Sequence, residues 1–367
     1  SFFTADFDWL ANKTSVAGRL GNITVRVPGR NASAVTGSGF LASDIGNIDV
    51  RLTDNAQQGV NAVALSTFKA TTGRIGSITV IHSQTGFVYN VGLGYAILTS
   101  TFSAATGIGA ITIQGRTLGA VFIVAGQPVV RAARAAAAMA PSAGTTIGPI
   151  TVVPAGSSEL TFDVGSGTID ERKYVTYSPG TLGDLSFLDA PAGTKITLVT
   201  KASAIGNVTV DATGGLAAAS LDLTASSAST VGDITVDGDA TLTVPTVQTL
   251  GQVGVGGMLS LPQGLASART VGAFTVGSLA ASRRNVVIGS ASLRSGTSIG
   301  RIQVGQANTG QGRYGFNFAA FGGSPSATVA GRGFNAVPRK AVAVRGVQLF
   351  MTASPPPRAK AFRKVGR

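Results

Sequence analysis

The chain has 367 residues, of which 50 are glycine, 44% are hydrophobic and only 12% are charged. This balance excludes a disordered chain, which requires low hydrophobicity and high charge. Cysteine is absent and histidine occurs once, so disulfides, thiolate chemistry, histidine-based triads and multi-histidine metal sites are excluded as well.

The formal net charge of +13 is spread unevenly along the sequence. Residues 1–158 carry a net +5, residues 159–239 carry a net −7, and residues 240–367 carry fifteen Lys or Arg with no acid. Segments of opposite sign favour electrostatic steering between partners. We therefore expect the basic C-terminal third to attract acidic surfaces, including the acidic middle of another copy.

The first element in chain order is an aromatic N-terminal segment, residues 1–19. It contains Phe2, Phe3, Phe7 and the only tryptophan, Trp9. An exposed sheet end recruits other chains unless it is covered. We expect this segment either to cap its own fold or to dock on a second copy.

A six-residue phrase follows and recurs eleven times: aliphatic, Gly, variable, aliphatic, usually Thr, aliphatic. The copies begin at Leu20, Ile45, Ile75, Ile108, Ile147, Leu182, Ile205, Val231, Leu250, Val271 and Ile299. Intervals between successive phrase glycines run from 19 to 39 residues, the range of stacked repeat architectures. Several intervals are too short for a propeller blade of about 40 residues.

Side chains alternate along a strand, so the fourth and sixth phrase positions share one face and the fifth takes the other. We predict an inward stack of Ile48, Ile78, Ile111, Ile150, Val208, Ile234 and Ile302. The outward Thr column is interrupted by Asp49, Ser186, Gly254 and Gln303, which favours β-propensity over ice binding as its explanation. The phrase glycine fits a corner where the backbone turns tightly or approaches the neighbouring coil.

These features predict an all-β fold, a single-stranded parallel β-helix (β-solenoid) of about eleven coils over residues 20–304. Each coil supplies one phrase strand and usually one or two others, and successive coils stack about 4.8 Å apart. Non-solenoid terminal segments are expected at residues 1–19 and 305–367. A short helical insertion is expected from Pro128 to Pro141, which is alanine-rich and bounded by prolines.

The most apolar region, residues 120–140, is interrupted by Gln127, Arg131 and Arg134. A membrane-spanning helix requires about 20 predominantly apolar residues. The sequence therefore predicts no membrane span.

The tandem phrase resembles the β-helical repeats of large bacterial surface and secreted proteins, over Leu20 to Val304. The resemblance implies an extracellular or cell-surface location. Pectate-lyase-like enzymes share this architecture. The matching residues here are structural positions, however, so the resemblance carries over no active site.

Few residues suggest a catalytic or metal-binding site. His82 follows the strand "IGSITVI", and we expect it to face outward or to lie in a loop. Asp170 and Glu171 adjoin Arg172 and Lys173, and further acids recur at Asp211, Asp233, Asp237 and Asp239. Stacked on one face, these acids would form a calcium site or an acid/base pair, whereas the alternative is a solvated face with turns. We predict no catalytic residue, no cofactor and no metal, and hence a protein that is not an enzyme.

The C-terminal segment joins apolar residues to a basic tail. We expect it, like the aromatic N-terminal segment, either to cap the rod or to dock on the next copy, and we predict assembly through both segments. The predicted interface consists of Phe2, Phe3, Phe7, Trp9, Arg339, Lys340, Arg345, Leu349, Phe350, Arg358, Lys360, Arg363 and Lys364. The expected function is a structural subunit that self-assembles into an extracellular filament, sheath or surface layer, with acidic polysaccharide or another polyanion as a second partner.

The alternative function is a polysaccharide-binding or polysaccharide-cleaving β-helix of the lyase or tailspike sort. The low acid content and the single histidine weigh against cleavage. Nucleic-acid binding is disfavoured because the Lys and Arg residues are spread singly, without a recognised motif.

Overall fold

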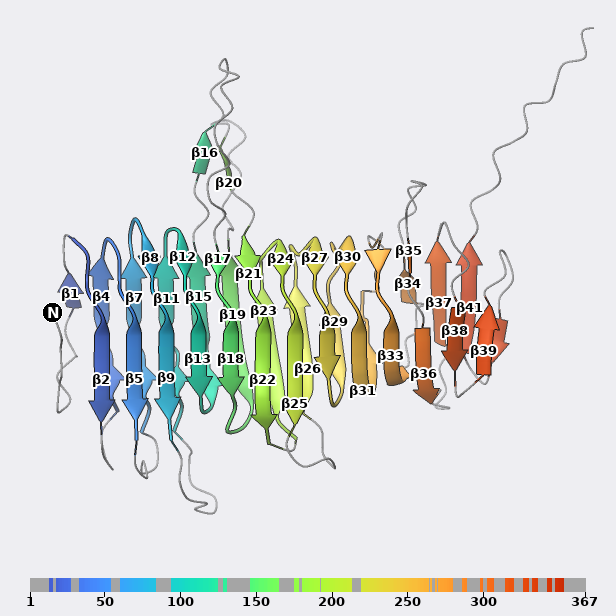
Figure 1. Cartoon of the computed structure of the whole chain (residues 1–367), viewed down its shortest axis with the longest axis horizontal. Helices are drawn as coiled ribbons and strands as arrows, with labels where there is room; N and C mark the ends of the chain where they lie inside the picture. Colours follow the sequence, from blue (N-terminus) through green and yellow to red (C-terminus); the bar gives the residue numbers. More distant parts are fainter. Residues whose placement is uncertain are drawn as a thin grey trace, which may run out of the picture.

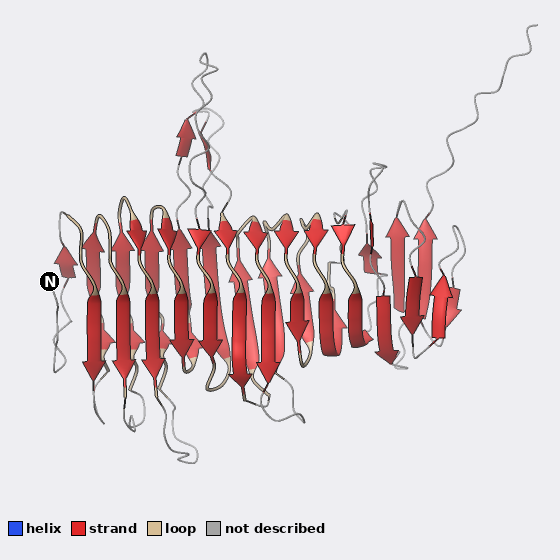
Figure 2. Ribbon diagram, in the orientation of Figure 1, coloured by secondary structure: helices blue, strands red, loops and turns tan. Residues whose placement is uncertain are grey.

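The structure is a computed structural model, and it describes residues 13–15, 18–27, 33–53, 60–83, 94–124, 128–130, 146–164, 175–177, 180–191, 193–212, 219–263, 265, 268, 270–279, 286–288, 298–299, 302–306, 314–319, 326–329, 332–335, 342–344 and 347–352. Only the backbone is described for residues 13–15, 128–130, 175–177 and 274 and for those beyond 275. The described residues form strands and no helix, stacked along one long axis from the N-terminal end (Figures 1 and 2). No membrane-spanning helix occurs in this part of the chain.

The eleven phrase copies form one column of parallel strands, as predicted. Its members are β2 (Ile23–Val27), β5 (Ile48–Leu52), β9 (Ile78–His82), β13 (Ile111–Gln114), β18 (Ile150–Val153), β22 (Leu185–Ala190), β25 (Val208–Ala212), β28 (Ile234–Val236), β31 (Val253–Ser260), β33 (Phe274–Leu279) and β36 (Ile302–Gln306). A further strand, β38 (Ser326–Val329), pairs in parallel with β36 and continues the column.

A second column of parallel strands lies on another side of each coil. It comprises β1 (Lys13–Ser15), β4 (Gly39–Ala42), β7 (Thr67–Ala70), β11 (Thr101–Ala104), β15 (Ala120–Val124), β19 (Ser158–Val164), β23 (Lys195–Thr200), β26 (Ser220–Ala225), β29 (Ala240–Thr243) and the second half of β31.

Two-residue strands complete the coils. Just before the phrase glycines lie β8 (Arg74–Ile75), β12 (Gly107–Ile108), β17 (Thr146–Ile147), β21 (Thr181–Leu182), β24 (Ala204–Ile205), β27 (Thr230–Val231), β30 (Thr249–Leu250), β32 (Thr270–Val271) and β35 (Ser298–Ile299). A fourth column is confined to the N-terminal coils: β3 (Val35–Thr36), β6 (Val63–Ala64), β10 (Ile97–Leu98) and β14 (Thr117–Leu118). The prediction of a β-solenoid is confirmed.

The core consists of like side chains stacked from coil to coil. The predicted stack is confirmed for Ile48, Ile78, Ile111, Ile150, Val208 and Ile234, each at most 1% exposed. Ile302 keeps the register of this stack, but its side chain lies outside the described residues. A second stack, formed by Phe40, Phe68, Phe102, Phe122 and Phe162, has neighbouring ring centroids 4.7–5.1 Å apart. Stacking thus buries identical side chains against each other along the rod.

The phrase glycines are explained by close approach and not by a left-handed backbone. A Cβ on Gly183 would lie 2.8 Å from the carbonyl carbon of Gly148 and 3.0 Å from the nitrogen of Pro149. No phrase glycine in the described part of the chain has a positive φ; Gly37 and Gly119, at +60°, lie at a different corner. Of the two roles expected for this glycine, the structure supports the approach of neighbouring coils.

The predicted helical insertion is wrong where the structure describes it. Its first residues form β16 (Pro128–Val130), which pairs antiparallel with β20 (Val175–Tyr177). The β-branched Val129 and Val130 favour a strand, and this preference outweighs the alanine-rich sequence that follows. The rest of the insertion lies outside the described residues.

The C-terminal strands form further pairings. β34 (Val286–Ile288), β37 (Tyr314–Ala319) and β41 (Val347–Thr352) are parallel neighbours, and β40 (Val342–Val344) pairs antiparallel with β41. β39 (Arg332–Asn335) forms an antiparallel pair with β38.

Candidate functional site

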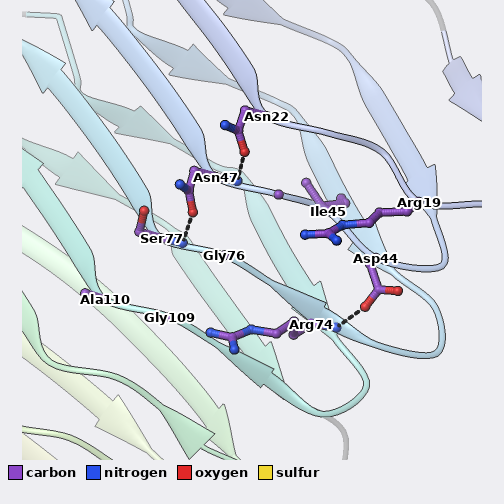
Figure 3. A pocket seen from close by; sticks show the side chains of 11 residues that line it. Arg19, Asn22, Asp44, Ile45, Asn47, Arg74, Gly76, Ser77, Gly109 and Ala110 are labelled. Atoms are coloured by element: carbon purple, nitrogen blue, oxygen red, sulfur yellow. Dashed lines mark hydrogen bonds between the residues drawn. The ribbon is translucent and has the colours of Figure 1, made fainter. Parts of the chain in front are cut away.

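A ladder of side-chain hydrogen bonds follows the phrase glycines along the rod. The third phrase position, which the sequence pattern leaves variable, carries Asn or Asp in several coils. Asn22 Oδ1 accepts the backbone N–H of Asn47, and Asn47 Oδ1 accepts that of Ser77, both at 2.9 Å (Figure 3). Each side chain therefore satisfies a backbone donor in the next coil.

The same ladder resumes in the acidic middle of the chain. Asp184 accepts the N–H of Asn207 at 2.8 Å, Asn207 accepts that of Asp233 at 2.9 Å, and Asp233 accepts that of Gln252 at 2.7 Å. The recurrence of Asn or Asp at the third phrase position was the sequence signal for this ladder. It shows that several acids of the chain are structural.

A hollow of about 580 Å³ opens beside the ladder in the N-terminal coils. We call it the arginine groove. Gly76 and Gly109 form its floor (Figure 3), and Gly46, Ile45 and Ala110 also line it. One wall carries Asn22, Asn47 and Ser77, and the other carries Arg19, Asp44 and Arg74. Because glycine has no side chain, the floor remains low between two polar walls.

The charged wall is built from equivalent positions in three successive coils. Arg19, Asp44 and Arg74 each precede the first residue of a phrase, and these first residues are bridged in parallel from coil to coil. Asp44 Oδ1 accepts the backbone N–H of Arg74 at 3.0 Å, which fixes the carboxylate. Both arginine side chains extend toward the glycine floor (Figure 3). Neither guanidinium forms an ion pair with any residue that the structure describes.

The prediction that His82 faces outward or lies in a loop is wrong. His82 is the last residue of β9 and only 2% exposed. The strand continues two residues beyond the phrase, so its alternation turns this side chain inward. Nε2 lies 2.9 Å from the carbonyl oxygen of Val60, and Nδ1 has no partner among the described residues. Burial lowers the pKa of His82, because desolvation penalises the charged imidazolium.

The predicted cluster of acids is only partly brought together. Asp239 accepts the backbone N–H of Met258 at 2.7 Å, and Asp237 accepts that of Ala212 at 3.1 Å. Asp211 shares a hydrogen bond with Asp237, which raises the pKa of Asp211. No group of three or more His, Asp or Glu side chains suited to a metal occurs among the described residues. Asp170, Glu171, Arg172 and Lys173 lie outside them.

Most residues of the predicted assembly interface also lie outside the described part of the chain. These are Phe2, Phe3, Phe7, Trp9, Arg339, Lys340, Arg345, Arg358, Lys360, Arg363 and Lys364. Leu349 and Phe350 lie in β41, where the backbone of Leu349 is in register with Phe316 and that of Phe350 with Asn317.

No protein-family model, curated protein or solved structure matches the chain.

Proposed function

We propose that the protein is a structural β-solenoid subunit that self-assembles through its terminal segments into an extracellular filament, sheath or surface layer. The observation that carries this proposal is the coil-to-coil register of the phrase positions, which is kept from β2 to β36. A parallel column of this kind has an edge at each end that pairs with another chain unless it is covered. Among the described strands, β1 pairs only with β4, and β2 only with β5.

The distribution of charge supports association between copies. Residues 240–367 carry fifteen cations and no acid, whereas residues 159–239 carry a net −7. A C-terminal segment that reaches the acidic middle of a neighbouring copy would bring opposite charges together. The aromatic N-terminal segment would supply apolar contacts.

We further propose that the protein has no enzymatic activity. Asp44, Asp184 and Asp233 accept backbone hydrogen bonds, which is a structural use of carboxylates. Glycosidases hold their two carboxyl groups about 5–9.5 Å apart. Asp211 and Asp237 share a direct hydrogen bond and are too close for that arrangement. Turnover of an acidic or neutral polysaccharide that is abolished by Asp170→Asn, Glu171→Gln or Asp211→Asn would contradict this proposal.

Two truncations of the full chain test self-assembly. The first ends after Thr352 and removes only the basic tail, residues 353–367. The second ends after residue 336 and also removes β40 and β41, whose pairings do not involve any phrase strand. The intact protein is expected to form polymers visible by negative-stain microscopy. The shorter truncation should assemble more slowly, and the longer one should sediment as a folded monomer.

The circular dichroism spectrum serves as the control for folding of each truncation. A polymer of unchanged morphology formed by residues 1–336 would show that the C-terminal segment is only a cap. An intact protein that remains monomeric at high concentration in low salt would refute self-assembly altogether.

A further inference from the structure

The charges of the arginine groove alternate at the spacing of the coils. Arg19, Asp44 and Arg74 occupy equivalent positions in three successive coils. With coils about 4.8 Å apart, the two arginine backbones are separated by roughly 10 Å along the rod, with the backbone of Asp44 midway. The positions of this wall thus alternate as cation, anion and cation along the rod; both guanidinium groups extend toward the glycine floor, and the Asp44 carboxylate is held at the backbone N–H of Arg74 (Figure 3).

The opposite wall supplies neutral hydrogen-bonding groups. The Oδ1 atoms of Asn22 and Asn47 are engaged in the ladder, which leaves their Nδ2 groups as donors. The hydroxyl of Ser77 lies next along the same wall (Figure 3). Among the described residues, none of those that line the groove is aromatic. Non-specific binding of single-stranded nucleic acid depends on aromatic stacking, so this lining disfavours such a ligand.

We propose that the arginine groove binds a polysaccharide in which an acidic sugar alternates with a neutral sugar. Carboxylates on the acidic units would meet Arg19 and Arg74, because guanidinium groups bind carboxylates through paired, charge-assisted hydrogen bonds. The intervening neutral unit would lie against Asp44 and donate its hydroxyls to that carboxylate. Two coils span roughly the length of a disaccharide unit, so each second sugar meets an arginine.

Asp44 is the residue that selects the alternating pattern. A polymer with a carboxylate on every sugar would place an anion against Asp44, and two neighbouring carboxylates repel each other. Asn at this position keeps an oxygen that can accept the N–H of Arg74, just as Asn22 and Asn47 accept equivalent bonds in the ladder. The substitution Asp44→Asn therefore removes the repulsion and retains the hydrogen bond.

Isothermal titration calorimetry on the full chain at physiological ionic strength tests this assignment. The alternating probe is hyaluronan hexasaccharide, and the uniformly charged probe is an oligogalacturonate of equal length. The unaltered protein should bind hyaluronan more tightly than the oligogalacturonate. Arg19→Ala/Arg74→Ala should weaken hyaluronan binding by roughly tenfold or more, because two charge-assisted contacts are lost. Asp44→Asn should strengthen binding of the oligogalacturonate.

The matched control removes two arginines from another part of the surface. Arg26 and Arg51 both contact Asp49, at 3.7 and 2.8 Å, and do not line the groove. Arg26→Ala/Arg51→Ala should change hyaluronan affinity by less than about twofold, the size of a rim-charge effect. Equal weakening by both double variants would show attraction to the basic chain in general and overturn the proposal. Absence of hyaluronan binding by the folded protein would also overturn it, as would equally tight binding of a hexanucleotide that the groove variant weakens.

The groove and self-assembly can fail separately. Arg74 lies two coils away from the edge strand β2, so Arg74→Ala should polymerise like the unaltered protein in sedimentation experiments. If the protein polymerises but does not bind hyaluronan, only the proposed ligand of the groove is refuted. If the protein stays monomeric but binds hyaluronan through Arg19 and Arg74, only the proposed structural function is refuted.

Discussion

At the scale of single residues, His82 places a titratable group in a core position. Its register neighbour in the preceding coil is Leu52, an apolar residue at 0% exposure. The lowered pKa means that the folded state favours neutral imidazole, whereas the unfolded chain takes up a proton near pH 6.5. Stability from this group is therefore fully present above about pH 6.5 and is lost as pH falls from there toward the folded-state pKa.

We expect the free energy of unfolding to decrease by up to about 1.4 kcal/mol per pH unit within that window. Chemical denaturation at a series of pH values measures this slope. Because the chain has one histidine, His82→Leu should remove the histidine-linked part of the slope completely. A variant that retains the slope between pH 7 and pH 5 would show that groups other than His82 control acid stability.

At the scale of the repeated element, the phrase glycine should be intolerant of any side chain. Gly183→Ala would press a methyl group against the backbone of Gly148 and Pro149, at distances of 2.8 to 3.0 Å. Overpacking of this kind costs roughly 1–3 kcal/mol, measurable by urea denaturation. Gly254→Ala is the matched control, because its new Cβ would have Ile234 oxygen, at 3.9 Å, as its nearest neighbour. Equal destabilisation by the two variants would refute close approach as the reason for the glycine.

The repeated phrase made the phrase column predictable from the sequence, whereas the other strand columns could not be predicted. Four of the six phrase positions repeat their chemistry in eleven coils, so register and inward positions follow from strand alternation alone. The phenylalanine stack has no such repeat: Phe162 is followed in register by Thr200, and the pattern stops. It was visible in sequence only as Phe two residues after Ser at Phe40, Phe68 and Phe102.

The arginine groove was harder to predict because its walls join residues from separate coils. Arg19, Asp44 and Arg74 are 25 and 30 residues apart in sequence, and each lies just outside the phrase. Their common position before the phrase was the available signal. The prediction for His82 was wrong for a related reason: the face that its side chain takes depends on how far the strand continues beyond the phrase.

At the scale of the whole molecule, charge and apolar surface have separable roles in the proposed assembly. The anchors Phe2, Phe3, Trp9, Leu349 and Phe350 should supply most of the affinity, and the opposite charges of the middle and C-terminal segments should supply orientation and rate. The Debye screening length shortens from about 10 Å at 0.1 M salt to about 3 Å at 1 M. Raising the salt over this range should therefore slow polymer growth, followed by light scattering, while the pelleted fraction at equilibrium changes little. Complete dissolution of the polymer at high salt would mean that ion pairs hold it together, and a growth rate independent of salt would mean that the charges do not steer association.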